Sequence, residues 1–327
     1  MRPQRDLTDP RRARDRLPLE PDRDPTFEEV VVPEEFGPVE LVVDDHKVKR
    51  HAFSQDDHGD WYLREGLGGV RIGHPGLLAN DLLQLFTTRY AASRVVGLHT
   101  AEELWFRAPV EVGSRVVLSG RYVEKYERRG QGHVVMEAAA TDVDGRVLLE
   151  HRGTEIMRTR PGEVAGRGSA GTTTGPRVTG ETDPALAPLE RLDGAPVPGA
   201  ALVPLTKEAT VEQMAVFSRV GEFVRNIHWD LDVARRGGLA VPIVQGQQQV
   251  CWLAELLART VGLGWFSTGW LSAKFLVPVR AFDVVEVGGV VREVTGAGEV
   301  ALDVWVRGAD GALATVGWAT ARLSATA

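Results

Sequence analysis

Apolar residues recur along this chain at two periods, one typical of a helix and one typical of strands. Within 248–262 the apolar positions lie three and four residues apart, at Val250, Leu253, Leu256 and Leu257. This spacing predicts an amphipathic helix. Within 116–130, 132–157 and 281–324, β-branched residues instead occupy alternating positions, which predicts strands. Turn signals at Asp144-Gly145 and Asp310-Gly311 predict hairpins, so we expect antiparallel pairing.

One segment of the pattern occurs twice. Residues 104–123 read LWFRAPVEVGSRVVLSGRYV, and residues 273–292 read AKFLVPVRAFDVVEVGGVVR. The matched positions are always 169 residues apart, and they are Phe106 and Phe275, Pro109 and Pro278, Val110 and Val279, and Gly120 and Gly289. A repeat of this length is far longer than a solenoid unit. It predicts a duplicated domain.

Both copies show the same order of elements. A Gly-rich loop (66–76 and 237–247) precedes a helical stretch (77–95 and 248–262), and strands follow. A long apolar helix followed by an antiparallel meander favours an α+β layer fold in which the sheet wraps the helix. We expect the two sheets to form one continuous layer with both helices on the same side.

Composition sets the domain boundaries. Residues 1–25 are mostly Arg, Asp, Pro and Leu, which predicts a disordered tail. Residues 160–195 begin with a stretch rich in Gly, Thr and Pro, which is linker composition. The expected domains are therefore 26–159 and 196–327.

Charge and cysteine content exclude several classes of function. The net charge is −7 and there is one cysteine, Cys251. A nucleic-acid partner needs a basic face, and a single cysteine forms neither an internal disulfide nor a cysteine zinc site. No apolar run has membrane-spanning length, and the arginines of the N-terminus precede no apolar stretch, unlike those of a signal peptide. We expect a cytoplasmic protein without nucleic-acid or membrane partners.

The most specific motif lies at 217–230, FSRVGEFVRNIHWD, followed by LDVARRGGLAVPIVQG. It resembles the MaoC-like family of hydratases and dehydratases, whose motif runs Phe/Tyr-Ser-x-x-x-Gly-Asp-x-Asn-Pro-Ile-His-x-Asp, with a later Ile-x-His-Gly. The positions that agree are Ser218, Ile227, His228, Asp230, Ala234, Gly238, Ile243 and Gly246. The resemblance implies a double hotdog fold and an acyl thioester substrate, carried on coenzyme A or an acyl-carrier protein. The reaction that it implies needs no metal or redox cofactor.

The second copy departs from the family at several site positions. Phe223 stands at the catalytic Asp, Arg225 at the Asn, Asn226 at the Pro, and Gln245 at the His of the His-Gly pair. Glu222, one position away, is a candidate for the missing carboxylate. Asp230 is expected to cap the helix that follows it, and Cys251 to be a small core residue.

The first copy departs in the opposite way. Its segment HAFSQDDHGDWYL (51–63) has Asp57 at the acid position and Tyr62 at the histidine position, and His74 lies where the His-Gly pair is expected. This copy therefore keeps a carboxylate and lacks the imidazole, whereas the second copy keeps His228. A site shared between Asp57 and His228 is an alternative to a local pair of Glu222 and His228.

These residues suggest the chemistry of water elimination or addition. A neutral imidazole, here His228, suits the base that takes the C2 proton, and Glu222 or Asp57 suits the acid. Helix N-terminal N–H groups at Gly246 suit the thioester oxygen. We place Gln245, Gln247, Tyr62, His74, Arg225 and Asn226 among the substrate-binding residues. Isomerisation, cyclisation or hydrolysis of a thioester, or acyl binding without catalysis, stay open. We expect either a monomer of two hotdogs or a homodimer.

Overall fold

The computed structural model describes residues 21, 23–64, 66, 69–95, 97–157, 177–192, 196–218, 225–295 and 298–323. Its strands are β1 (Glu34–Val42), β2 (Leu98–Phe106), β3 (Arg115–Arg128), β4 (Gln131–Asp142), β5 (Val147–Ile156), β6 (Leu205–Lys207), β7 (Trp270–Phe275), β8 (Val285–Val294), β9 (Glu299–Gly308) and β10 (Leu313–Arg322). Its helices are α2 (Asp45–Gln55), α3 (Asp60–Leu63), α4 (Ala79–Leu83), η2 (Gln84–Thr88), η3 (Ala92–Arg94), α5 (Val211–Ser218), α6 (Leu231–Arg236), α7 (Gly246–Val261) and α8 (Leu263–Thr268).

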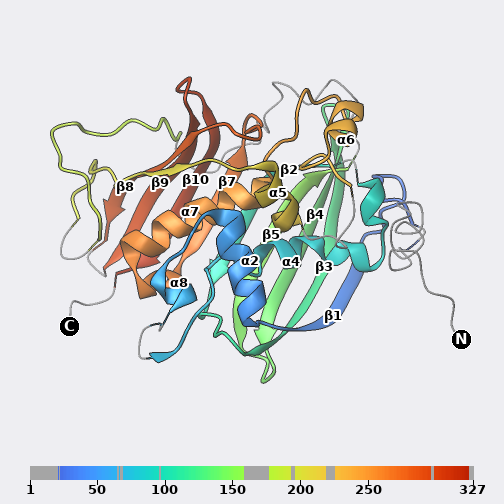
Figure 1. The fold of residues 1–327 in the computed structure, drawn as a ribbon, viewed down its shortest axis with the longest axis horizontal. Helices are drawn as coiled ribbons and strands as arrows, with labels where there is room; N and C mark the ends of the chain where they lie inside the picture. The colour runs from blue at the N-terminus through green and yellow to red at the C-terminus, as the bar shows by residue number, and fades with distance from the viewer. Residues whose placement is uncertain are drawn as a thin grey trace, which may run out of the picture.

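The strands form one antiparallel sheet that runs through both halves of the chain. Their order is β1-β3-β4-β5-β2-β7-β10-β9-β8-β6. The halves meet where β2 pairs with β7, from Ala101 opposite Lys274 to Trp105 opposite Trp270. The helices α2, α4, α7 and α8 all lie on one side of this sheet (Figure 1). The prediction of one continuous layer with the helices on the same side is confirmed.

The repeat seen in the sequence corresponds to a structural repeat. Phe106 ends β2 and Phe275 ends β7, so equivalent strands pair with each other at the centre of the sheet. The loops repeat as well. In the first half the Gly73 N–H donates to the Val110 carbonyl, and in the second half the Val244 N–H donates to the Val279 carbonyl. The chain is a double hotdog, as the resemblance implied.

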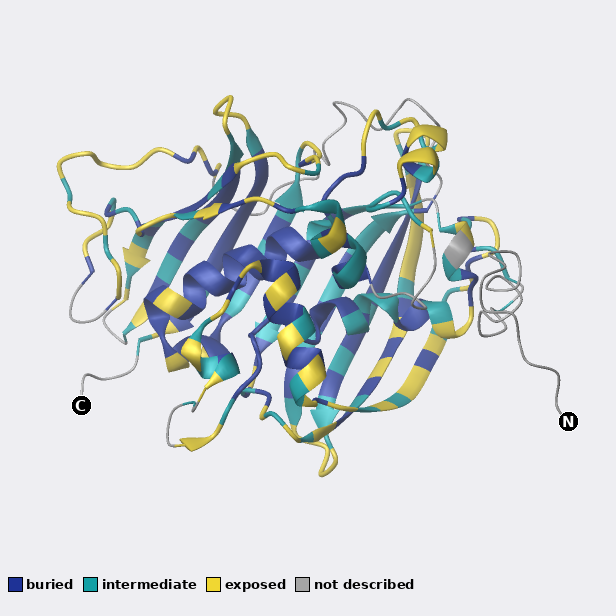
Figure 2. Cartoon of the chain, in the orientation of Figure 1, coloured by how far each residue is buried: buried dark blue, intermediate teal, exposed yellow. Residues whose placement is uncertain are grey.

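The central helix is long in one half only. The predicted helix 248–262 is confirmed as α7, which is buried over almost its whole length (Figure 2). The predicted helix 77–95 is wrong in extent, since α4 ends at Leu83 and gives way to the 3₁₀ turn η2. The hydroxyls of Thr87 and Thr88 donate to the carbonyls of Gln84 and Leu85. Such local bonds compete with helix propagation.

Some residues of the predicted tail and linker contact the folded parts of the chain. Arg23 lies within the predicted tail, yet its guanidinium pairs with Glu34 and donates to the Tyr90 hydroxyl. Within the predicted linker, Val178 and Leu192 are buried against the second half. Residues 1–20, 22 and 158–176 lie outside the described residues, so the domain boundaries stay a prediction. Among the described helices, none is long and apolar enough to cross a membrane.

Candidate functional site

His228 is held in a turn just before α6. Its backbone N–H donates to the Asn226 side chain at 2.9 Å, and Asp230 caps α6 as expected, accepting from the N–H groups of Asp232 and Val233. The Nδ1 atom lies 2.8 Å from the carbonyl oxygen of Ile243. A carbonyl only accepts, so Nδ1 carries the proton and Nε2 carries the lone pair.

The surroundings of His228 favour the neutral imidazole. Burial lowers the pKa of His228 to about 4, and the bond to Ile243 opposes this only in part. The ring is therefore uncharged at neutral pH, with Nε2 ready to accept a proton. This is the protonation state that the role of base requires.

The N-terminus of α7 lies beside His228. Gln245 is its N-cap residue, and Gly246 and Gln247 open the helix. The first N–H groups of a helix have no intrahelical partner and carry partial positive charge. An added Cβ at Gly246 would lie 2.8 Å from a ring carbon of Phe275. Glycine therefore lets the Phe275 ring pack directly on the start of α7.

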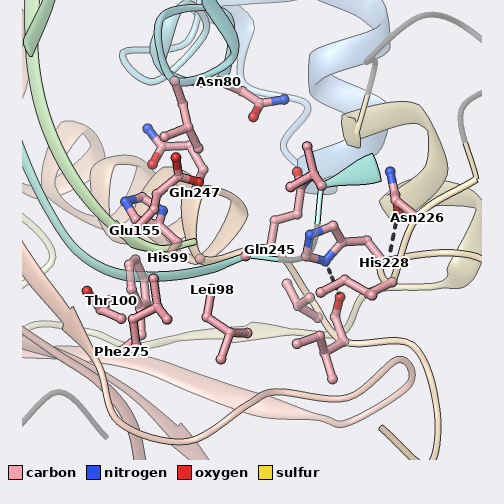
Figure 3. A pocket seen from close by; sticks show the side chains of 18 of the residues that line it. Asn80, Leu98, His99, Thr100, Glu155, Asn226, His228, Gln245, Gln247 and Phe275 are labelled. Carbon is pink, nitrogen blue, oxygen red and sulfur yellow. Dashed lines mark hydrogen bonds between the residues drawn. The ribbon is translucent and has the colours of Figure 1, made fainter. Parts of the chain in front are cut away.

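One cavity of about 170 Å³ joins these elements (Figure 3). Residues of both halves line it, so the site lies where the two halves of the sheet meet, at the pairing of β2 with β7. The second half contributes Asn226, His228, Gln245, Gly246 and Gln247, and the first half contributes Asn80, Gln84, His99, Thr100 and Glu155. The remaining lining is mostly apolar. A cavity with apolar walls and a few convergent polar groups is typical of a small-molecule site.

The structure places the first-half candidates elsewhere. Asp57, Tyr62 and His74 are only 1%, 3% and 2% exposed, and none of them lines the cavity of His228. Asp57 Oδ2 is 3.8 Å from His74 Nε2, and Asp57 Oδ1 is 3.2 Å from Arg259. The structure thus brings these three together in a closed cluster. It does not bring Asp57 to His228.

Cations of the second half close this cluster. Lys207 Nζ lies 2.6 Å from Glu255, and it donates to the carbonyls of Gln55 and Asp56. Burial, followed by the charges of Lys207 and Arg259, lowers the pKa of His74 to about 3. The equivalent of the second-half site is therefore filled by side chains.

Possible metal ligands gather in the same closed cluster. Within the described residues they form two groups that share His74, namely His51, His74 and Cys251, and Asp57, His74 and Glu255. Gly76 N–H donates to His74 Nδ1 at 2.9 Å, which leaves the proton of the neutral ring on Nε2. A metal at Nε2 would have to displace that proton beside Lys207 and Arg259. The cluster fits a structural role better than a metal site.

Of the remaining second-half candidates, some line the cavity of His228 and others do not. Asn226, Gln245, Gly246 and Gln247 line the cavity. Arg225 does not, and its guanidinium pairs with Asp230 and Asp232. Glu222 lies outside the described residues and stays a prediction.

The motif comparison missed a polar group on the first-half wall of the cavity. His99 and Glu155 line the cavity, and Glu102 lies behind His99 with its Oε2 atom 2.9 Å from His99 Nε2. A carboxylate and an imidazole in a strand that faces the core are an unusual pattern. That pattern could have singled out His99 and Glu102 from the sequence, although it would not have indicated what they do.

Comparison with solved structures supports the fold, whereas no protein-family profile and no curated protein matches the chain. A MaoC-like dehydratase is 14% identical, with a TM-score of 0.69 over 89% of this chain and 98% of its own. A MaoC-like dehydratase from Phytophthora capsici is 13% identical, with a TM-score of 0.59 over 90% and 96%.

A third solved structure is a conserved hypothetical protein, Rv0216 from Mycobacterium tuberculosis, described as having a double hotdog fold. It is 16% identical, with a TM-score of 0.63 over 91% of this chain and 98% of its own. At such low identity these likenesses concern the fold. The chain therefore has the double hotdog fold that is also found in MaoC-like dehydratases.

Proposed function

We propose that this protein is a hydratase or dehydratase that adds water to, or removes it from, an acyl thioester. The observation that carries the proposal is the meeting of His228 and the N-terminus of α7 in one cavity. The fold, shared with MaoC-like dehydratases, agrees with this chemistry. Fold alone does not define function, so the proposal rests on the site.

Elimination of water needs a base at C2 of the thioester. His228 fits this role because its Nε2 carries a lone pair and the ring is neutral at pH 7. As the C2 proton moves to Nε2, negative charge develops on the thioester oxygen. In this scheme the N–H groups of Gly246 and Gln247, which line the same cavity, stabilise that charge.

The substrate must reach the cavity as a thioester of coenzyme A or of an acyl-carrier protein. The apolar part of the wall suits an acyl chain, and it includes Leu98, Ile156 and Phe275. The polar part suits a 3-hydroxyl or the water that replaces it. No step in this reaction requires a redox cofactor.

Single-base chemistry, such as isomerisation, is the second candidate. The observation in its favour is that Nδ1 of His228 is bound to a carbonyl rather than to the carboxylate of an Asp-His pair. A base oriented in this way can still take a proton from C2.

A panel of thioesters separates these functions. The protein is incubated with 3-hydroxyacyl and 2-enoyl thioesters of several chain lengths, and the products are analysed by mass spectrometry. A gain or loss of one water on at least one substrate supports the proposal. Double-bond movement without a mass change favours the isomerase, and no change on any substrate rejects both.

A further inference from the structure

A second group with proton-transfer chemistry faces the cavity from the first half of the chain. His99 lies near the start of β2, its side chain is 8% exposed, and its Nε2 atom is 2.9 Å from Oε2 of Glu102. The Glu102 side chain is fully enclosed. His99 and Glu155 line the cavity of His228 and stand directly opposite each other on β2 and β5. Figure 3 shows them together beside Gln247.

A β-bulge brings His99 and Glu102 together. Residues three apart on a regular strand point to opposite faces. The pairing of β2 with β5 shifts between His99 and Ala101, so Thr100 is an extra residue. Such a bulge reverses the alternation. It therefore turns His99 to the same face as Glu102.

The opposite strand leaves room for this pair. Gly153 faces Glu102 across β2 and β5, and an added Cβ there would lie 2.7 Å from the His151 ring and 3.1 Å from Glu102 Oε2. His151 Nδ1 is 3.5 Å from the other oxygen of Glu102. Glycine at 153 thus allows a carboxylate and two imidazoles to lie together inside the protein.

The pair is also connected to the N-terminus of α7. Gln247 donates to Glu102 Oε1 at 3.3 Å. The ring centres of His99 and Phe275 are 4.9 Å apart, and Phe275 packs on Gly246. His99 is therefore one aromatic ring away from the N–H groups assigned to the thioester oxygen.

We propose that His99, held in place by Glu102, is the proton donor that completes the site of His228. This inference rests on the proposed function and assigns the acid role to the first half of the chain. In dehydration, His228 takes the C2 proton and the imidazolium of His99 gives one proton to the departing hydroxyl, which leaves as water. In hydration, neutral His99 takes a proton from water and protonated His228 gives one to C2. Protons balance in both directions.

The surroundings of the two imidazoles shift their pKa values in opposite directions, as the roles of acid and base require. Burial lowers the pKa of His99, but the Glu102 carboxylate 2.9 Å away more than offsets it, so the net pKa is raised. Burial lowers the pKa of His228 to about 4. Titratable groups whose environments push their pKa values apart mark an acid and a base.

Other titratable groups surround His99. They are Glu102 on its own strand, Glu155 and His151 on β5, and Cys251 on α7 behind Glu102. Burial raises the pKa of Glu155 to about 7, which makes Glu155 the rival proton donor. The experiment must therefore include it.

The test compares His99→Gln and His99→Asn with the wild-type protein in two assays. One assay measures loss of water from a 3-hydroxyacyl thioester. The other measures exchange of the C2 hydrogen of a saturated acyl thioester with deuterium oxide, which needs the base but no proton donor. Both His99 variants should lose about 10²-fold or more in elimination, the usual size of a general-acid contribution. They should keep C2 exchange within about threefold, which also shows that the site is folded.

Glu102 is a positioning residue in this scheme, so Glu102→Gln should lower kcat more than it changes KM. The matched control is His133→Gln, because His133 lies on β4 of the same half, stacked on Tyr126 and away from the cavity. This control should leave both assays unchanged.

Several results would overturn the inference. Elimination by the His99 variants within a few-fold of wild type would show that His99 gives no proton. Equal loss of elimination and exchange would make its role structural. A large loss in Glu155→Gln or Glu222→Gln, with His99→Gln active, would assign the donor to that residue. Wild-type protein that eliminates water but shows no C2 exchange would contradict the role of His228. Wild-type protein that transforms no thioester would reject the proposed function itself.

Discussion

The closed first-half cluster can be tested by changing Asp57 to asparagine. The substitution keeps the shape of the side chain and removes its charge. Asp57 is 1% exposed and accepts from Arg259 and from Gly59 N–H, each at 3.2 Å. If the cluster is structural, this change should affect stability and leave the cavity of His228 intact.

The structure sets the expected size of the effect. Asparagine can still accept from Gly59, and Arg259 keeps its 2.6 Å contact with Glu255. The bonds from Gly59 and Arg259 both go to Oδ1, which asparagine keeps. The loss is therefore the negative charge that strengthens the bond to Arg259, about 1.5–3 kcal/mol. The new amide also faces the N–H of His74 Nε2, which adds to the cost. We expect Asp57→Asn to lower the free energy of unfolding by about 2–3 kcal/mol and to change turnover by less than about threefold.

Urea denaturation measures the free energy of unfolding, and the dehydration assay measures turnover. Asp60→Asn is the matched control, because Asp60 lies three residues away and its side chain is 70% exposed. That change should alter stability by no more than about 0.5 kcal/mol. A loss of turnover beyond 10²-fold in Asp57→Asn with unchanged stability would refute the account. Asp57 would then belong to a site shared with His228.

Three further predictions concern the cavity itself. His228→Ala should lower turnover by about two to four orders of magnitude while the thermal melt stays cooperative, and activity within a few-fold of wild type would make this histidine structural. Because the unfolded state binds the His228 proton near pH 6.5 and the folded state only near pH 4, lowering the pH across this range should cost about 3 kcal/mol of stability. Comparing urea midpoints of wild type and His228→Gln between pH 7 and 4 checks this, and equal pH slopes would contradict it. Gly246→Ala should lower the free energy of unfolding by about 1–3 kcal/mol by crowding the Phe275 ring, and Phe275→Leu in the same chain should recover part of that loss on denaturation.

The sequence predicts the architecture well because the fold depends on repeated local patterns. Alternation gives the strands, the turn signals give antiparallel hairpins, and the matched pair Phe106 and Phe275 marks the two strands that meet at the seam. The periodicity of 248–262 predicts α7 because its apolar positions recur at helical spacing. The stretch 77–95 has similar spacing, but Thr87 and Thr88 bond to local carbonyls and the helix ends early.

The candidate site is less accessible to the same reasoning. The motif leads to His228, Asn226 and Gly246, which do line the cavity. It also leads to Asp57, whose place in the closed cluster depends on the approach of Arg259 from the distant α7. His99 escapes notice because the bulge at Thr100 changes which residues share a face. Burial, bulges and contacts between distant segments are set by tertiary packing, and no local spacing encodes them.

Addition of water to an acyl thioester at His228 can be tested directly with isotope-labelled water. A 2-enoyl thioester is incubated with the protein in water enriched in the heavy oxygen isotope, and the product is fragmented in a mass spectrometer. Wild-type protein should place the label in a new 3-hydroxyl group, and His228→Gln should lower labelling by about 10²-fold or more. Label in a released carboxylate would instead identify a thioesterase. No incorporation on any chain length, or equal incorporation by His228→Gln, would contradict hydration at His228.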